Sequence, residues 1–426
     1  MKMTKIKAFV LVSVFLVGCV STKVSYEIPS SRKTNYAALY DPGSSNINPR
    51  VRPYHASNDK TFIFFTMNLD NLMPTPGNDQ RQGGGVRLGV KYAIRSAQTR
   101  EIADSASLSY DFKSHERGVF INYFPTSLKS GQGYFASIIF FDKNKKSYKP
   151  FVFNINKSTH GNANYFFPEY LTPERTPLFY DFISGNRKIR ITSDLIKEDS
   201  VMMLRFPVDS LCPAAPYVTE QAISMAKNPE FISYYRMGDT ISLDTSGFYW
   251  FTADTATTNG LGIYRESVFF PWIRQITDMV NPVKYISTAK EYEKIISDEN
   301  TKLAVDEFWY AQGKTEDRAK ELIRIYYNRV QLANQFFTAE KAGWRTDRGM
   351  VYVVLGAPHE VYKDAGKEKW VYGATDDYQG LVFNFVRDSA SLSNNEFILI
   401  RDKRYKDAWM QAVQSWREGY AYSVPE

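Results

Sequence analysis

The sequence predicts a mainly β protein with several domains: two tandem β-sandwiches followed by a small α+β domain led by a long helix. Short apolar runs with strand character recur from residue 61 to about residue 270. Near Pro271 the hydrophobic period changes to 3.6, and apolar runs with strand character return after residue 349. Aromatic residues make up 15% of the 426 residues and charged residues 23%, which favours folded sheets over disorder.

Residues 1–18 have the features of a secretory signal peptide. Three lysines precede an apolar run over residues 8–17, which is too short to span a bilayer comfortably. The run leads into the letters LVGC, which resemble the lipobox of bacterial lipoproteins. This resemblance implies that Cys19 becomes the first residue and carries lipid, with an ordinary signal peptide as the alternative. Each buried methylene contributes about 0.8 kcal/mol, so three acyl chains would hold the protein almost irreversibly.

Residues 19–58 are expected to be a flexible tether that starts at the lipidated Cys19. They mix Ser, Asn, Pro and Tyr with isolated charges and show no sustained period. No Asp follows the cysteine, which by resemblance to Gram-negative lipoproteins implies sorting to the outer membrane. The letters VSTKVSY contain no acidic residue, so the folded part is expected to face the periplasm.

Residues 59–157 are predicted to form the first β-sandwich. Clusters of Gly, Asn, Asp and Lys separate six apolar runs: TFIFFTMNL, VRLGVKYAI, SLSYDF, GVFINYF, GYFASIIFF and KPFVFNI. The glycine-rich stretch 74–86 is interpreted as a hairpin loop and not as a phosphate cradle, because a strand follows it and no GK[ST] is present.

A linker marked by prolines is expected over residues 158–177, and a second β-sandwich over residues 178–270. Its predicted strands are LFYDFIS, KIRITSD, VMMLRFPV, DTISLD, GFYWFTAD and YRESVFF. Residues 213–237 interrupt the strand pattern with a prolyl loop and one possible helix.

Residues 271–426 are predicted to form the helical region and the α+β domain. Helices are expected over 288–298, 302–312 and 405–418, and Thr315 opens a longer one with acidic residues in its first turn. One apolar face of this helix is formed by Ala319, Leu322, Ile323, Tyr326, Val330, Ala333 and Phe337. Antiparallel strands packed on this helix are expected at MVYVVLG, KWVYG, LVFNFVRD and EFILIR.

The letters NRVQLANQFFTAEKAGWRTD, followed by RGMVYVVLGAP, resemble the GWxTD domain. Matching positions are Gly343, Trp344, Thr346, Asp347, Arg348, Gly349, Tyr352, Gly356, Pro358 and Glu360, with a Trp-Val-Tyr strand at residues 370–372. His359 departs from the pattern, where the family commonly has Asp. The resemblance covers at most residues 270–420 and implies a cell-envelope protein, often a lipoprotein of Bacteroidota, in a family whose biochemical role is not established.

The motif residues are interpreted first as a folding device. Gly343 is expected to end the long helix or to permit a left-handed turn, and Trp344 to enter the core as a large anchor. Thr346 and Asp347 would hydrogen-bond the turn that Gly349 closes.

Arg348 would pair with a carboxylate such as Glu360, and residues 356–358 would form a sharp corner. In the catalytic alternative, Asp347 and Glu360 act as paired carboxylates with His359 as proton carrier and Arg348 as anion clamp. We expect no catalytic residues, because no GxSxG, Walker or GxGxxG loop stands in the right context.

Composition argues against several other classes of protein. Without the lysines of residues 1–18 the net charge falls from +7 to about +4, too weak to indicate nucleic-acid binding. Cys212 is the second of two cysteines, so no internal disulfide is expected once Cys19 is lipidated. No metal site and no cofactor are expected, because the four histidines lack ligand spacing: His55, His115, His160 and His359.

These features favour a non-enzymatic interaction subunit of a cell-envelope complex for secretion, outer-membrane assembly or gliding, with envelope proteins as partners. Tandem sandwiches present edge strands and aromatic loops, which are common docking surfaces. A glycan- or peptidoglycan-binding protein is the first alternative, and exposed Trp and Tyr side chains on one sandwich face would favour it. The hydrolase built on Asp347, Glu360 and His359 is the second alternative.

Overall fold

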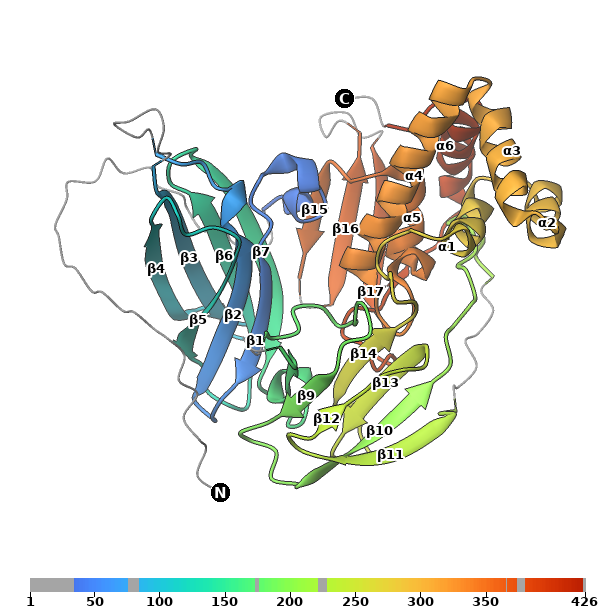
Figure 1. Ribbon diagram of the computed structural model, residues 1–426. Helices are drawn as coiled ribbons and strands as arrows, with labels where there is room; N and C mark the ends of the chain where they lie inside the picture. Colours follow the sequence, from blue (N-terminus) through green and yellow to red (C-terminus); the bar gives the residue numbers. More distant parts are fainter. Residues whose placement is uncertain are drawn as a thin grey trace.

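The computed structural model describes residues 34–75, 84–172, 176–220, 228–364, 366–373 and 380–423. Five antiparallel sheets and a helical C-terminal region make up these residues (Figure 1). The predicted fold class, mainly β with an α+β region at the C-terminal end, is confirmed. Figure 1 shows one sandwich at the left, a second at the bottom and the C-terminal domain at the upper right.

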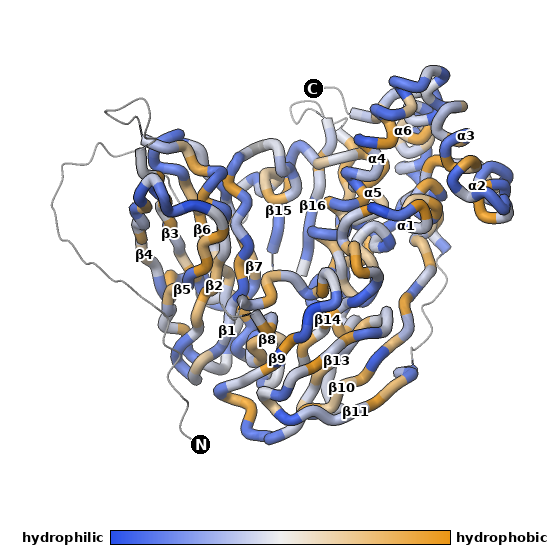
Figure 2. The backbone as a smooth tube through the Cα atoms, in the orientation of Figure 1, coloured by the Kyte–Doolittle hydropathy of each residue, from blue (hydrophilic) through white to orange (hydrophobic). Residues whose placement is uncertain are grey.

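Two facing sheets form the first sandwich, and all six predicted strands are present. One sheet has the order β1-β2-β5, with β1 Arg50–His55, β2 Lys60–Asn68 and β5 Val119–Ser127. The other has the order β4-β3-β6-β7, with β3 Val86–Ser96, β4 Ile102–Phe112, β6 Gly133–Asp142 and β7 Ser147–Asn156. Burial alternates along β2, as expected for a strand with one face on the core. Hydrophilic and hydrophobic residues also alternate along the strands in Figure 2.

The expected tether is wrong for residues 34–58. Strand β1 pairs with β2, while Tyr36 and Tyr40 are 0% and 5% exposed. Tyr36 N donates to Val361 O at 2.8 Å, so the segment is held by the C-terminal domain. Its side chains contact separate parts of the molecule rather than one sheet face, and this explains why the sequence shows no period. Cys19 and the LVGC letters lie outside the described residues.

The second sandwich is also built from two sheets. One has the order β12-β9-β8, with β8 Phe167–Tyr170, β9 Ile189–Thr192 and β12 Thr240–Ile241. The other has the order β11-β10-β13-β14, with β10 Ser200–Phe206, β11 Phe231–Arg236, β13 Gly247–Thr252 and β14 Leu261–Arg265.

Three expectations for this region need correction. Strand β8 lies inside the expected linker 158–177. Pro168 suggests a linker, but a proline is tolerated in a strand at a sheet edge, which is where β8 lies. The run LFYDFIS forms an isolated bridge from Phe182 to Tyr264 and no full strand. Strand β11 lies inside the expected interruption at 213–237, of which residues 221–227 are not described.

The C-terminal domain packs helices against a sheet of order β15-β16-β17-β18. Its helices are α1 Ile276–Val280, α2 Ala289–Ser297, α3 Thr301–Gly313, α4 Glu316–Phe337, α5 Asp347–Leu355 and α6 Lys406–Arg417. Its strands are β15 Glu360–Lys363, β16 Lys367–Tyr372, β17 Leu381–Arg387 and β18 Phe397–Leu399. The Thr315 side chain accepts from Arg318 N at 3.4 Å and caps α4, as predicted. Among the described residues, no helix is both long and apolar enough to cross a membrane.

The run MVYVVLG is the helix α5 and not the predicted strand. Every residue of α5 is buried, so its sequence carries no polar face that would reveal a period of 3.6. The Thr346 side chain accepts from Gly349 N at 3.0 Å and caps the helix at its first turn. An unbroken apolar run fits a buried strand and a buried helix equally well, and here the cap decides in favour of a helix.

One hydrophobic cluster joins all three parts of the molecule. It centres on α4 and α5 and includes Tyr36 and Tyr40 of the N-terminal segment. Phe135 of the first sandwich and Trp250 of the second belong to the same cluster. The sandwiches and the C-terminal domain are therefore packed together, and each sandwich has in addition its own core.

Candidate functional site

The motif loop, residues 343–349, connects α4 to α5, includes the first turn of α5 and contacts the last turns of α4. A Cβ atom on Gly343 would lie 2.0 Å from Ala333 O, and one on Gly349 would lie 1.8 Å from Gly343 O. Only glycine permits this backbone approach. Helix α4 ends at Phe337 and Gly343 does not have a positive φ, so both expectations for Gly343, a helix end and a left-handed turn, are wrong.

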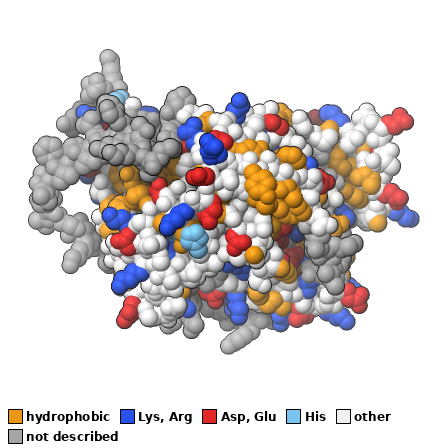
Figure 3. Space-filling view, turned by 90° about the horizontal axis from the view of Figure 1, so that it is seen from below, with side chains coloured by type: hydrophobic (Ala, Val, Ile, Leu, Met, Phe, Trp, Pro, Cys, Tyr) orange, Lys and Arg blue, Asp and Glu red, His pale blue; other side chains and the backbone are white. Residues whose placement is uncertain are grey.

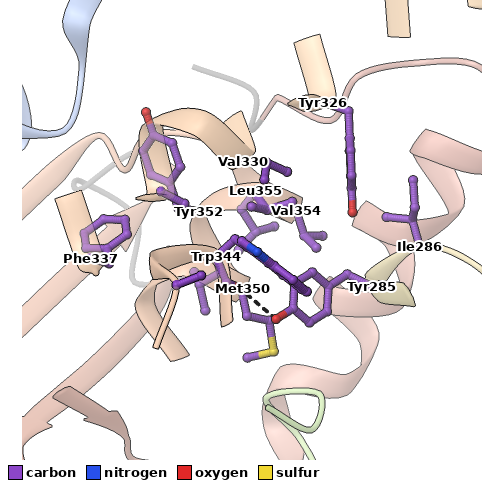
Figure 4. Packing of buried hydrophobic residues seen from close by; sticks show 14 of the residues in the cluster. Tyr285, Ile286, Tyr326, Val330, Phe337, Trp344, Met350, Tyr352, Val354 and Leu355 are labelled. Atoms are coloured by element: carbon purple, nitrogen blue, oxygen red, sulfur yellow. Dashed lines mark hydrogen bonds between the residues drawn. The ribbon is translucent and has the colours of Figure 1, made fainter. Parts of the chain in front are cut away.

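Trp344 is the core anchor that the sequence predicts. It is 4% exposed, and its ring lies edge-on to that of Tyr285 with centroids 6.0 Å apart. Tyr285 Oη donates to Trp344 O at 2.9 Å, and Asn334 Oδ1 accepts from Trp344 N at 3.2 Å. Figure 4 shows the indole beside Tyr285, among side chains of α4 and α5. The loop is thus held by its backbone as well as by its largest side chain.

Arg345, the variable residue of the motif, reaches the second sandwich. Its Nη1 lies 2.9 Å from Glu266 Oε1, and Glu266 directly follows β14. The guanidinium also lies over the Trp344 ring, 4.6 Å from its centroid. The loop therefore connects the end of the second sandwich to the C-terminal core.

Asp347 is buried in an ion pair and does not close the expected turn. Its Oδ1 lies 2.5 Å from Arg401 Nη2, and its Oδ2 accepts from Leu399 N at 2.8 Å. Burial raises the pKa of the Asp347 carboxyl, and Arg401 opposes that rise. Arg401 Nη1 donates to the carbonyls of Ala214 and Ala215 at 2.6 and 2.8 Å. Through Arg401, Asp347 holds the segment that leaves strand β10 of the second sandwich.

Arg348 pairs with Glu368 and not with the expected Glu360. The Arg348 Nη1 to Glu368 Oε1 distance is 2.8 Å, and the two side chains are 1% and 0% exposed. The guanidinium is sandwiched between the rings of Phe337 and Phe397, at 5.0 and 4.3 Å. Its Nη2 donates to Asn395 O at 2.6 Å. The motif arginine is therefore part of the core.

Glu368 binds two cationic side chains, Arg348 and Lys363, and also contacts the N-terminal segment. Lys363 Nζ lies 2.7 Å from its Oε1, and Tyr40 Oη donates to its Oε2 at 3.0 Å. Burial by itself raises the pKa of Glu368, but Lys363 and Arg348 outweigh it and lower the pKa to about 2. The carboxylate is thus charged at neutral pH and acts as the centre of a buried network.

The structure separates the residues of the catalytic alternative. Asp347 binds the backbone of β18, whereas Glu360 lies on β15 at the opposite edge of the sheet, and three strand spacings, about 14 Å, separate these two strands. His359 Nδ1 accepts from Gly373 N at 3.0 Å, and Glu360 Oε2 accepts from Tyr362 Oη at 2.9 Å. These groups do not converge on a point where a substrate could react.

The expected corner at residues 356–358 directly follows helix α5. Gly356 has φ +88° and ends the helix. Arg329 Nη1 donates to Val354 O at 3.0 Å, and Arg329 Nη2 donates to Tyr422 O at 2.7 Å. Arg329 thus binds the last carbonyls of α5, where a cation is favourable.

Sequence reasoning missed four buried or partly buried polar residues that hold the motif in place: Arg329, Asn334, Glu368 and Arg401. Arg329 and Asn334 are part of the RVxxAN letters, which were the available signal. Glu368 stands in a Lys-Glu-Lys sequence typical of an exposed strand, so nothing local revealed its burial.

Glu396 is a buried carboxylate beside this network. Its Oε1 lies 3.6 Å from Lys341 Nζ, and its Oε2 has no hydrogen-bond partner among the described residues. Burial raises the pKa of Glu396 to about 7, although Lys341 and Arg348 lower it. The folded protein therefore favours the protonated form of this side chain.

Replacing Glu396 with glutamine is expected to stabilise the protein at neutral and higher pH. A pKa raised from 4.5 to about 7 means that wild-type stability falls as pH rises through this window, because the unfolded carboxyl ionises first. Glutamine does not titrate. The free energy of unfolding of the variant, relative to that of the wild type, should therefore increase as pH rises through this window. Urea unfolding at both ends measures this, and a difference that stays constant with pH would contradict the assignment.

The described residues contain no group of three or more His, Cys, Asp or Glu side chains that could hold a metal ion. Cys212 is partly buried, and burial raises the pKa of its thiol.

Comparisons with known proteins identify one domain. Residues 247–418 match the family model described as the GWxTD domain. No curated protein matches the chain. A β-glucuronidase of Bacteroides uniformis is similar over 29% of this chain and 13% of its own, with 8% identity and a TM-score of 0.18. A putative β-galactosidase of Bacteroides fragilis is similar over 36% of this chain and 19% of its own, with 12% identity and a TM-score of 0.18.

Proposed function

Because this chain contains a GWxTD domain, we propose that it is an outer-membrane lipoprotein facing the periplasm and a non-enzymatic interaction subunit of a cell-envelope complex. Secretion, outer-membrane assembly and gliding are the processes such a complex would serve. Lipid on Cys19 would attach the protein to the membrane.

The main support for the proposal is that the charged motif residues form ion pairs within the chain. Arg345 binds Glu266, Asp347 binds Arg401, and Arg348 binds Glu368. These three pairs fix the end of the second sandwich, the segment after β10 and the N-terminal segment around Tyr40. Each charge is engaged within the chain and buried, so the motif serves as a junction that holds the domains together.

A rigid junction suits a protein that presents surfaces to partners. The two sandwiches are packed on the C-terminal domain through a shared core, which fixes the relative positions of their edges and loops. A membrane anchor would raise the effective concentration of neighbouring envelope proteins, so modest contacts would suffice for binding.

The proposal is tested by purifying the full-length protein from its own membranes after chemical cross-linking. We expect specific envelope proteins to co-purify. Glu360→Gln, which leaves the buried network intact, should retain these partners and the wild-type phenotype. A Glu360→Gln protein that folds and keeps its partners yet behaves as a null would overturn the non-enzymatic role.

Cys19→Ser is expected to abolish incorporation of radiolabelled palmitate and normal processing. The thioether bond to lipid needs the cysteine sulfur, and serine cannot form it. Labelling of cells that express the wild type, Cys19→Ser or Cys212→Ser measures this, and the Cys212→Ser control should label like the wild type. Label that persists in the Cys19→Ser protein would show that the lipobox interpretation is wrong.

Glycan binding is the second candidate, and one observation favours it. Trp272 is 47% exposed and lines a hollow of about 220 Å³ together with Asp278 and Asn281. Indole rings and polar side chains are the groups that bind sugars, through stacking and hydrogen bonds. Quenching of tryptophan fluorescence by soluble peptidoglycan fragments, present in the wild type and absent in Trp272→Ala, would support this candidate.

A further inference from the structure

Within the part of the chain that the structure describes, strand β11 is an open edge of the second sandwich. It lies at the end of the sheet order β11-β10-β13-β14, and Figure 1 shows it as the outermost strand at the bottom of the molecule. Phe231, Ile232 and Tyr234 are 48%, 52% and 67% exposed. Figure 3, seen from below, shows hydrophobic side chains gathered over this sandwich. An exposed apolar edge of this kind readily accepts another strand.

The other sheet edges among the described residues are protected. Strands β12 and β18 have two and three residues, and β4 carries serine and aspartate on its exposed face. Proline interrupts β1, β5, β7 and β8. Backbone contacts cover the last two edges, through Ile183 N to Tyr264 O on β14 and Tyr36 N to Val361 O on β15. Strand β11 has none of these protections from any segment that the structure describes, so its exposure points to an occupant.

The backbone register shows which groups of β11 are available. Met237 N donates to Asp199 O, in continuation of the β10–β11 pairing of Arg236 with Ser200. Hydrogen-bonding direction alternates along an antiparallel strand. The N–H groups of Ile232, Tyr234 and Arg236 therefore point away from β10, towards the open edge.

We propose that two copies of this chain associate through β11, antiparallel to each other, about a two-fold axis at Ser233. In this register Ile232 of each copy lies opposite Tyr234 of the other, which pairs the exposed apolar groups. Glu230 lies opposite Arg236 at both ends. Its carboxylate also pairs with Arg205 of its own chain at 3.0 Å and remains half exposed, so in the dimer it would lie between two arginines. The amides and carbonyls of Ile232 and Tyr234 match the hydrogen-bonded positions of an antiparallel ladder, whereas Glu230 N donates to Arg205 O of its own chain at 2.8 Å.

Self-complementarity is the reason to choose a second copy as the occupant. A symmetric interface requires that a patch match itself, and the letters EFISYYR do so around their central serine. A six-residue strand pair is smaller than a stable interface of about 1,200–2,000 Å². The dimer is accordingly weak in solution, and confinement to a membrane surface would favour it.

Disulfide trapping tests the register directly. Residues at a non-hydrogen-bonded antiparallel pair have Cα atoms about 4.5 Å apart, within the range a disulfide spans. We expect Ser233→Cys, in the full chain with Cys19→Ser and Cys212→Ser, to form a covalent dimer with copper phenanthroline as oxidant. Ser107→Cys on the exposed face of β4 is the control and should remain monomeric. Equal cross-linking of the two variants, or of neither, would overturn the proposal.

A charge exchange distinguishes self-association from binding of another protein. Arg236→Glu places glutamates opposite each other, and Glu230→Arg places arginines opposite each other, so each Ser233→Cys variant alone should lose the dimer. A mixture of the two restores both Glu–Arg pairs and should recover it. If the mixture stays monomeric while either variant still binds a strand of another envelope protein, the edge serves that partner and the proposal fails.

Discussion

Replacing Glu368 with alanine is expected to destabilise the C-terminal domain by about 3–5 kcal/mol, the cost of removing one partner from a buried ion pair. Glu368 accepts from both Arg348 and Lys363. The side chains of Glu368 and Arg348 are 0% and 1% exposed. Alanine leaves two cations inside the protein without their counter-charge, and Tyr40 loses its acceptor. Urea unfolding followed by circular dichroism measures the loss.

Two comparisons make this result specific. Asp306→Ala breaks the exposed Lys302–Asp306 pair of 2.5 Å, and it should cost at most about 1 kcal/mol. Glu368→Gln keeps the shape of the side chain and removes the charge. Because the pKa of Glu368 is lowered from 4.5 to about 2, its contribution is present above pH 4.5 and is lost as pH falls below that value. The difference between wild type and Glu368→Gln should therefore shrink on acidification, and a difference that grows would contradict the buried ion pair.

Trp344→Ala is expected to cost about 3–5 kcal/mol, as for other truncations of buried aromatic side chains. Trp344 fills the space between Tyr285 and helix α5, and its ring also supports the Arg345 guanidinium. Its loss leaves a cavity at the start of α5, so hydrogen exchange of the α5 amides should accelerate. Trp272→Ala is the matched control, because Trp272 is 47% exposed and its removal deletes less buried surface than the removal of Trp344, which is 4% exposed. A Trp344→Ala protein with the urea midpoint and α5 exchange of the control would show that the indole does not support the core.

The strands of both sandwiches could be predicted largely because their sequences record burial locally. Every second residue of β2 faces the core, so the run TFIFFTMNL reports its own conformation. The same holds for α4, where Thr315 caps the helix and Leu322, Tyr326 and Val330 mark its buried face. Trp344 could likewise be placed in the core from its size and its position before an apolar run.

The remaining features depend on contacts between distant parts of the chain. Tyr40 is buried because Tyr352 Oη donates to its carbonyl and Glu368 accepts from its hydroxyl, more than 300 residues away. Arg348 and Asp347 each needed an oppositely charged partner, but many candidates exist in the sequence and only the fold selects Glu368 and Arg401. Helix α5 was missed because complete burial removes the periodic signal. Lipid on Cys19 stays a prediction.

The docking of the N-terminal segment determines how a pull on the membrane anchor would be transmitted. If Cys19 carries lipid as proposed, 14 residues separate it from Thr34, a reach of at most about 50 Å. Beyond that length, tension would act first on the hydrogen bonds from Asn35 to His359 O and from Tyr36 to Val361 O. The force would enter the folded part at the edge of the C-terminal sheet and would not pass through either sandwich.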